Sequence, residues 1–168
     1  MADERFKVAA VQMLSFEGEH ERNLERMLAR IAEAAEAGAR LIVFPEASNN
    51  GYFFKDRADA HRKATPIPGP FTEALGREAR KHGVWVVAGM FEQGDNDDVF
   101  NCAVLIGPDG ELVGKYQKNF FIKADKRWFT IYPSFLRGDS KLEQTLAWKP
   151  FKKTSEHKDM FSRLLQGE

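Results

Sequence analysis

Apolar residues along this chain fall into short runs that alternate with segments of helical spacing. Helices are predicted at Asn23–Ala37 and Phe71–His82, where apolar side chains recur every three or four residues. Gly38 and Gly83 follow these segments, as glycines that end helices do, and Pro70 suits a first helical position. Five runs have the length of a strand: Phe6–Met13, Leu41–Phe44, Val84–Met90, Val99–Ile106 and Glu111–Lys118.

The order of these elements is β-α-β-α-β-β-β, which combines helical crossovers with one antiparallel hairpin. The segment Gly107-Pro108-Asp109-Gly110 separates the last two strands and has the composition of a hairpin turn. Strands that are almost continuously apolar are typical of a sheet covered on both faces. We therefore predict an α/β layered domain with a mixed sheet.

The pattern changes after Lys118, where aromatic residues and lysines are scattered without a clear period. Residues 1–118 carry 15 basic and 19 acidic side chains, whereas residues 119–168 carry 10 basic and 6 acidic ones. We predict a domain over residues 1–130 and a divergent tail over residues 131–168. In one interpretation, the tail contains a short terminal helix with an apolar stripe formed by Met160, Phe161, Leu164 and Leu165. In the other interpretation, it is a frayed basic tail.

Composition excludes several classes of protein. With 168 residues and 25 basic against 25 acidic side chains, the chain has no basic surplus for nucleic acid or an acidic membrane surface. The single cysteine excludes an internal disulfide and suits a reducing compartment. No apolar run is long enough to span a bilayer, so we expect a cytoplasmic protein.

Two charged residues follow predicted strands, where open α/β sheets place their ligands. Glu46 comes after Pro45 and before the aromatic residues at 52–54, so partial desolvation would favour a general base. Lys118 ends the fifth strand, where a cation could stabilise an oxyanion. Taken singly, each is better explained by an ordinary surface charge at a strand end.

The remaining candidates favour structural roles. Cys102 lies within an apolar strand, where burial suppresses the thiolate, so we interpret it as a core residue and not a nucleophile. Ser15 and Ser48 are weaker candidates for a nucleophile and fit turn or cap positions better. The four histidines have no metal-ligand spacing, so we expect no metal site.

The chain resembles the nitrilase superfamily of carbon–nitrogen hydrolases in an ordered series of motifs across residues 6–118. The series comprises Val8-Ala9-Ala10-Val11-Gln12-Met13, Leu41-Ile42-Val43-Phe44-Pro45-Glu46, Gly51-Tyr52, Gly89-Met90-Phe91-Glu92, Phe100-Asn101-Cys102-Ala103 and Gly114-Lys115-Tyr116-Gln117-Lys118. The resemblance weakens towards Phe129.

This resemblance implies part of an αββα sandwich and a Glu–Lys–Cys mechanism that needs no cofactor. Glu46 then matches the general base, and Lys118 matches the lysine that stabilises the tetrahedral intermediate. Glu92 matches a second carboxylate near the substrate, with Tyr52 also supporting the site. Asp125-Lys126 matches a later Glu-Lys element, with Asp in place of Glu.

One departure from the family pattern changes the functional interpretation. The family's nucleophilic cysteine follows a strand well after the lysine, but no cysteine follows Lys118 here. We therefore expect a hydrolase of amides, carbamoyl compounds or nitriles that is truncated before its nucleophile and inactive alone. Three explanations account for residues 131–168: a truncated or frameshifted gene product, an alternative exon, or a new end that caps the half-domain. The abrupt change in residue pattern favours a rearranged reading frame.

The alternative is a non-catalytic binding or assembly module. Half of a sandwich would expose apolar sheet surface, and such surfaces commonly bind partners. The chain would then form a homo-oligomer or pair with a full-length relative.

Overall fold

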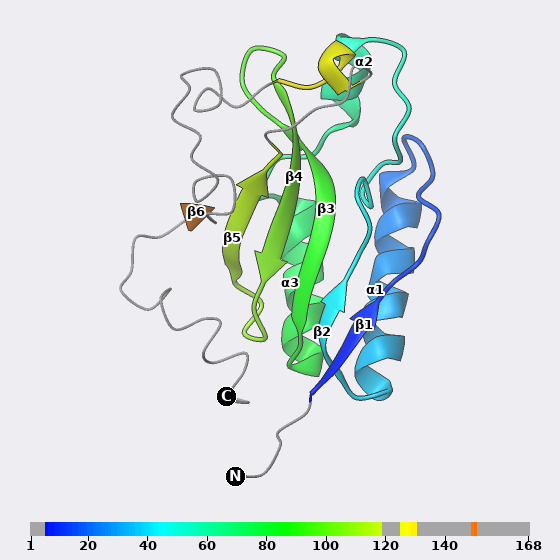
Figure 1. The fold of residues 1–168 in the computed structure, drawn as a ribbon, viewed down its shortest axis with the longest axis vertical. Coiled ribbons are helices and arrows are strands. Elements are labelled where there is room, and N and C mark those ends of the chain that lie inside the picture. Colours follow the sequence, from blue (N-terminus) through cyan, green and yellow to red (C-terminus); the bar gives the residue numbers. More distant parts are fainter. Residues whose placement is uncertain (1–5, 119–124, 131–148, 151–168) are drawn as a thin grey trace.

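The computed structural model describes residues 6–118, 125–130 and 149–150, which form one mixed sheet with helices packed on it (Figure 1). The strands lie side by side in sequence order: β1 (Lys7–Ala10), β2 (Ala39–Val43), β3 (Trp85–Gln93), β4 (Val99–Ile106), β5 (Leu112–Gln117) and β6 (Lys149–Pro150). Neighbouring strands from β1 to β3 are parallel, and those from β3 to β6 are antiparallel.

Two long helices, α1 (His20–Glu36) and α3 (Pro70–His82), cover one face of the sheet and pack against each other. α3 begins with reciprocal hydrogen bonds between the Gly69 backbone and the Thr72 hydroxyl group. It ends at Gly83, whose φ of 63° is the left-handed conformation expected of a terminating glycine. Pro70 and Gly83 therefore delimit α3 as the sequence predicted.

The register of β3 and β4 sorts their side chains onto two faces. Met90 pairs with Cys102 and Phe91 pairs with Asn101, and the members of each pair point the same way. Met90 and Cys102 belong to the core beneath α1 and α3, so we call their side the helix face. The opposite side is the open face, and its members by register include Val8, Leu41, Val43, Val87, Phe91, Asn101 and Ala103.

The open face differs from the expectation of a sheet covered on both sides. Within residues 6–118, 125–130 and 149–150, the loop at 47–54, α2 (Arg57–Lys63) and the segment at 125–130 pack over it, at one end. Val8 is 54% exposed, and Leu41, Val43 and Val87 are only half-buried. The almost continuously apolar strands predicted that both faces of the sheet are buried. Within the described residues, much of the open face is instead accessible.

Two elements were not predicted from the sequence. α2 has only seven residues, too few to establish an apolar period, but Asp56 is an N-cap whose carboxylate accepts a hydrogen bond from Asp59 N at 2.7 Å. β6 extends the sheet beyond β5 from within the predicted tail. The predicted terminal helix near Met160 lies outside the described residues, so the division at residue 130 stays a prediction.

Candidate active site

Glu46 lies in a tight turn immediately after β2. Phe44 N donates to Val87 O, and Ser48 N donates to Gly89 O, both at 2.8 Å, so the turn is bonded to β3 on both sides of Glu46. Ala47 adopts a φ of 60°, which is uncommon for a residue with a Cβ atom. A Cβ atom at Gly89 would lie 2.6 Å from Glu46 Cα, so only glycine allows this close approach.

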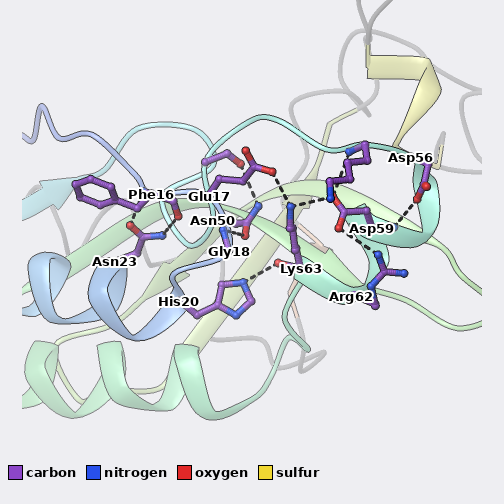
Figure 2. Close-up of polar contacts among 12 residues, drawn as sticks. Phe16, Glu17, Gly18, His20, Asn23, Asn50, Asp56, Asp59, Arg62 and Lys63 are labelled. Carbon is purple, nitrogen blue, oxygen red and sulfur yellow. Dashed lines mark hydrogen bonds and ion pairs between the residues drawn. The ribbon is translucent and has the colours of Figure 1, made fainter.

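Buried asparagines anchor the loop that follows Glu46. Asn49 exchanges two 3.0 Å hydrogen bonds with the Phe91 backbone, in the manner of an added strand. Asn50 Oδ1 accepts a 2.9 Å hydrogen bond from Gly18 N (Figure 2). Because both amides are fully buried and bonded to the main chain, the turn that carries Glu46 has little freedom to move.

The segment before α1 is joined to α2 by an ion pair between Glu17 and Lys63 that Figure 2 shows. Lys63 Nζ lies 2.6 Å from Glu17 Oε1 and 2.8 Å from Asp59 Oδ2. The hydrogen bond from Lys63 is the largest of the interactions that lower the pKa of Asp59. These contacts hold the 14–19 segment against α2, beside the Asn50 loop.

Lys118 reaches Glu46 from the end of β5. Its backbone N–H donates to Asn101 O at 2.8 Å, which continues the β4–β5 pairing by one residue. Its Nζ lies 2.8 Å from Glu46 Oε1 and 3.2 Å from Asp125 Oδ2. Desolvation alone lowers the pKa of Lys118, but the bonds to both carboxylates outweigh it and hold that pKa above the usual lysine value. A protonated lysine is thus fixed between two carboxylates.

Asp125 and Tyr52 complete this polar cluster. Asp125 is fully buried at the start of a 3-10 helix, η1 (Asp125–Arg127), and its Oδ1 accepts a hydrogen bond from the Tyr52 hydroxyl group. Burial raises the pKa of Tyr52, as do its bond to Asp125 and the nearby charge of Glu46. Tyr52 is therefore a neutral donor that orients Asp125 towards Lys118.

Aromatic packing holds Asp125 in place. Phe91 and Phe129 stack with ring centroids 4.8 Å apart, and Tyr52 and Phe54 contact both rings edge to face. Thr130 N donates to Val99 O at 2.6 Å, which ties the same segment to β4. Residues 125–130 are thereby fixed over the end of the open face.

Glu92, the second carboxylate expected from the family resemblance, is not in this cluster. It follows Met90 by two residues, so the pleat places it on the helix face. There its carboxylate binds Lys115 Nζ and accepts a 2.9 Å hydrogen bond from Gln117 Nε2. The structure instead brings Asp125 to Lys118, and Asp125 is the residue that matched the later Glu-Lys element.

Cys102 also lies on the helix face, although it adjoins Asn101 in the chain. Its side chain is 3% exposed, and Sγ donates to Met90 O at 3.4 Å. Burial, followed by the charge of Glu92, raises the pKa of this thiol strongly, and Lys115 offsets only part of the effect. This setting supports a core role. Ser48 is likewise buried, and its hydroxyl group donates to Pro45 O at 2.6 Å, as a turn residue does.

Two features of the cluster differ from or add to the sequence interpretation. The Glu46 side chain is 47% exposed, so its desolvation is weaker than expected. Asn101 was not identified, yet its Nδ2 donates to Glu46 Oε1 at 2.6 Å. Its only signal in the sequence is an amide within the otherwise apolar run of β4.

The described residues contain neither a metal-binding cluster nor a membrane-spanning helix. Within residues 6–118, 125–130 and 149–150, no group of three or more histidine, cysteine or acidic side chains could hold a metal ion. No helix in that part of the chain is both long and apolar enough to cross a lipid bilayer.

Comparisons with known proteins identify related sequences. The carbon–nitrogen hydrolase family model matches residues 7–152, whereas the motifs seen in the sequence weaken by Phe129. The nitrilase of Pyrococcus abyssi is 40% identical over 124 residues, which cover 73% of this chain and 47% of that protein. Omega-amidase NIT2 of Xenopus tropicalis is 33% identical over 121 residues, covering 72% of this chain and 42% of its own length.

Solved structures show the same fold. An N-terminal amidase crystallised with a Gln-Gly peptide superposes with a TM-score of 0.66 at 22% identity, covering 76% of this chain and 31% of the amidase. An amidase from Nesterenkonia sp. gives 0.61 at 21% identity, with 76% and 48% covered. The chain thus spans less than half the length of the relatives described here.

Proposed function

The chain belongs to the carbon–nitrogen hydrolase family, and from this premise we propose that it supplies the base and the lysine of an active site for amide-type bonds. The observation that carries the proposal is the position of Lys118 Nζ, 2.8 Å from Glu46 Oε1 and 3.2 Å from Asp125 Oδ2. Besides a nucleophile, covalent hydrolysis of a C–N bond requires a general base and a fixed cation, and these two lie together at one end of the sheet.

In the proposed reaction of an amide, Glu46 accepts the proton of a thiol while the sulfur attacks the carbonyl carbon. Lys118 Nζ stabilises the negative charge that develops on the carbonyl oxygen. Glu46 then returns the proton to the nitrogen, the C–N bond breaks, and an amine or ammonia leaves a thioester. Water deprotonated by Glu46 attacks the thioester and releases the acid and the thiol.

The thiol in this scheme is not Cys102. That residue is buried on the helix face, whereas Glu46 and Lys118 meet over the open face. It is also the one cysteine of these 168 residues. We therefore expect the 168-residue chain by itself to lack covalent turnover, and the proposed reaction needs a thiol from outside it.

The proposed substrates are small amides, carbamoyl compounds or nitriles. The relatives named nitrilase and omega-amidase support this class without selecting one member of it. The balanced charge and the single reduced thiol further support a cytoplasmic protein that binds neither nucleic acid nor membranes.

A chimera tests the proposal. Residues 7–130 of this chain would replace the matching part of the Pyrococcus abyssi nitrilase, which keeps its own remaining sequence. Ammonia release from a panel of amides and nitriles should occur in the chimera and fall at least about a hundredfold in its Glu46→Gln and Lys118→Met variants. A folded chimera that is inactive, or that is active without Glu46, would contradict the proposed roles.

The 168-residue chain itself provides the second arm of the test. It should release no ammonia above background. Turnover by this chain that disappears in Cys102→Ala would overturn the assignment of that thiol to the core.

The open face favours a second candidate function, an assembly module. Val8 is 54% exposed beside the half-buried Leu41 and Val43, which is unusual for a lone domain. Self-association or pairing with a full-length relative would bury this surface. Light scattering should then show an oligomer that Val8→Lys weakens, whereas a compact monomer at high concentration would exclude self-association.

A further inference from the structure

Asn101 connects the two charged residues of the candidate site. Its side-chain Nδ2 donates to Glu46 Oε1 at 2.6 Å, and its backbone oxygen accepts the 2.8 Å bond from Lys118 N. Only 3% of Asn101 is exposed, and it lies in the middle of the sheet, between β3 and β5. A single residue of β4 thus touches both partners of the Glu46–Lys118 ion pair.

The ion pair needs such a support because its members are long and accessible. The side chains of Glu46 and Lys118 are 47% and 28% exposed. Pairs of this kind lose side-chain entropy when they form, which cancels much of their attraction. A buried amide that already holds the carboxylate reduces that loss, because the carboxylate is in place before the lysine approaches.

The two donors also determine which carboxylate oxygen remains for chemistry. Within the described part of the chain, Asn101 Nδ2 and Lys118 Nζ both bind Oε1 of Glu46. Oε2 is consequently the oxygen that can accept a proton from a nucleophile. An amide suits this role because it donates a hydrogen bond without bringing a charge of its own.

We propose that Asn101 is the positioning residue of the Glu46 base, which it holds against Lys118 with Oε2 directed to the reaction. This inference rests on the proposed function of Glu46 and Lys118. Asn101 acts through the carboxylate and does not itself touch the reacting atoms.

The pKa of Lys118 reports on this arrangement without any need for turnover. Among the described residues, Glu46, on the turn after β2, and Asp125, on η1, bind Lys118 and raise its pKa. Tyr52 lies beyond Asp125 and stays neutral. Loss of the Asn101 amide should loosen Glu46 alone, so the pKa of Lys118 should fall while its bond to Asp125 persists.

The chain offers a matched control for this experiment. Gln117 adjoins Lys118 and donates a 2.9 Å hydrogen bond to the carboxylate of Glu92. This pair is the same kind of amide-to-carboxylate contact, but on the helix face. Gln117→Leu therefore removes an equivalent hydrogen bond next to Lys118 without touching Glu46.

The test is an NMR titration of the Lys118 side chain in the full 168-residue protein. Asn101→Leu should increase the acid dissociation constant of Lys118 about twofold to threefold, whereas Gln117→Leu should leave it unchanged. In a Glu46→Gln background, Asn101→Leu should have no further effect, since the carboxylate through which it acts is gone. Asn101→Ala provides a second variant should the leucine prevent folding.

Three results would overturn the inference: an unchanged titration in a folded Asn101 variant, an equal change in Gln117→Leu, or an undiminished effect without Glu46. These outcomes are separable from those of the chimera. An inactive chimera leaves the titration result valid, and an unchanged titration leaves the activity of the chimera valid.

Discussion

Lys118 Nζ and Glu46 Oε1 lie 2.8 Å apart, although 72 positions of sequence separate the two residues. Each lies one to three residues beyond the end of a strand, and those strands, β2 and β5, are held in one sheet by β3 and β4 between them. The contact is therefore a product of sheet order and register. Its consequences can be measured by changing either residue or the backbone between them.

The first prediction concerns the pH dependence of the Glu46–Lys118 pair. Because the pKa of Lys118 is raised in the folded chain, the stabilisation is complete below the pKa of the unfolded lysine and disappears as pH rises through the folded value. Lys118→Met should thus lower the free energy of unfolding by about 0.5 kcal/mol at neutral pH. Urea unfolding should show that this difference vanishes in strongly alkaline solution.

A second expectation concerns Tyr52 and Asp125. Asp125→Asn removes a charge that disfavours the tyrosinate, so the pKa of Tyr52 should fall. It should stay above the ordinary tyrosine value, because burial, the larger cause, remains. NMR titration of the tyrosine rings measures this. Tyr116, on β5, provides an internal reference, and an equal change in its titration would indicate a general disturbance of the sheet.

Cys102 should be unreactive in the folded chain. Its thiol is 3% exposed and its pKa is raised, so little thiolate is present and reagents cannot reach it. Modification by an aromatic disulfide reagent should proceed only at the rate of unfolding and become rapid in urea. Fast modification of the native protein would contradict the core assignment. Cys102→Ala should reduce stability by about 1 kcal/mol through a small cavity.

These properties differ in how far the sequence could predict them. Strand ends follow from the apolar runs, which made Glu46 and Lys118 candidates, but only the family resemblance assigned a role to either residue. The faces were harder to predict. The alternation of side chains along β3 puts Glu92 on the same face of the sheet as Met90. The direction of Glu46 cannot be obtained in this way, because Glu46 lies in a turn, where the period of two no longer applies.

Asn101 and Asp125 show a second limit. The role of Asn101 depends on the register that sets it opposite Lys118. A single polar residue in an apolar strand does not indicate which residue it will bind. Asp125 depends on the aromatic contacts of Phe129 and Tyr52, which join segments more than 70 residues apart. Such contacts are decided by tertiary packing and carry no local period. The family resemblance supplied a match for Asp125, but it gave Asn101 no role.

The last prediction concerns Gly89, which lets the Glu46 turn pass close to β3. An added Cβ atom would lie 2.6 Å from Glu46 Cα and 2.7 Å from Pro45 O, and both are backbone atoms that cannot rotate away. Gly89→Ala should therefore cost about 1–3 kcal/mol of stability and displace the turn. The displacement should separate Glu46 from Lys118, so the pKa of Lys118 should fall in NMR titrations of the folded variant.

Gly83→Ala is the matched control. Gly83 has a φ of 63°, but an added Cβ atom would meet no atom within 4 Å. The cost there is about 1–2 kcal/mol of backbone strain, comparable in size but remote from Glu46. This variant should be destabilised while the pKa of Lys118 is unchanged. If both glycine variants altered that pKa equally, loss of stability would be the cause, and the close approach at Gly89 would not be what positions Glu46.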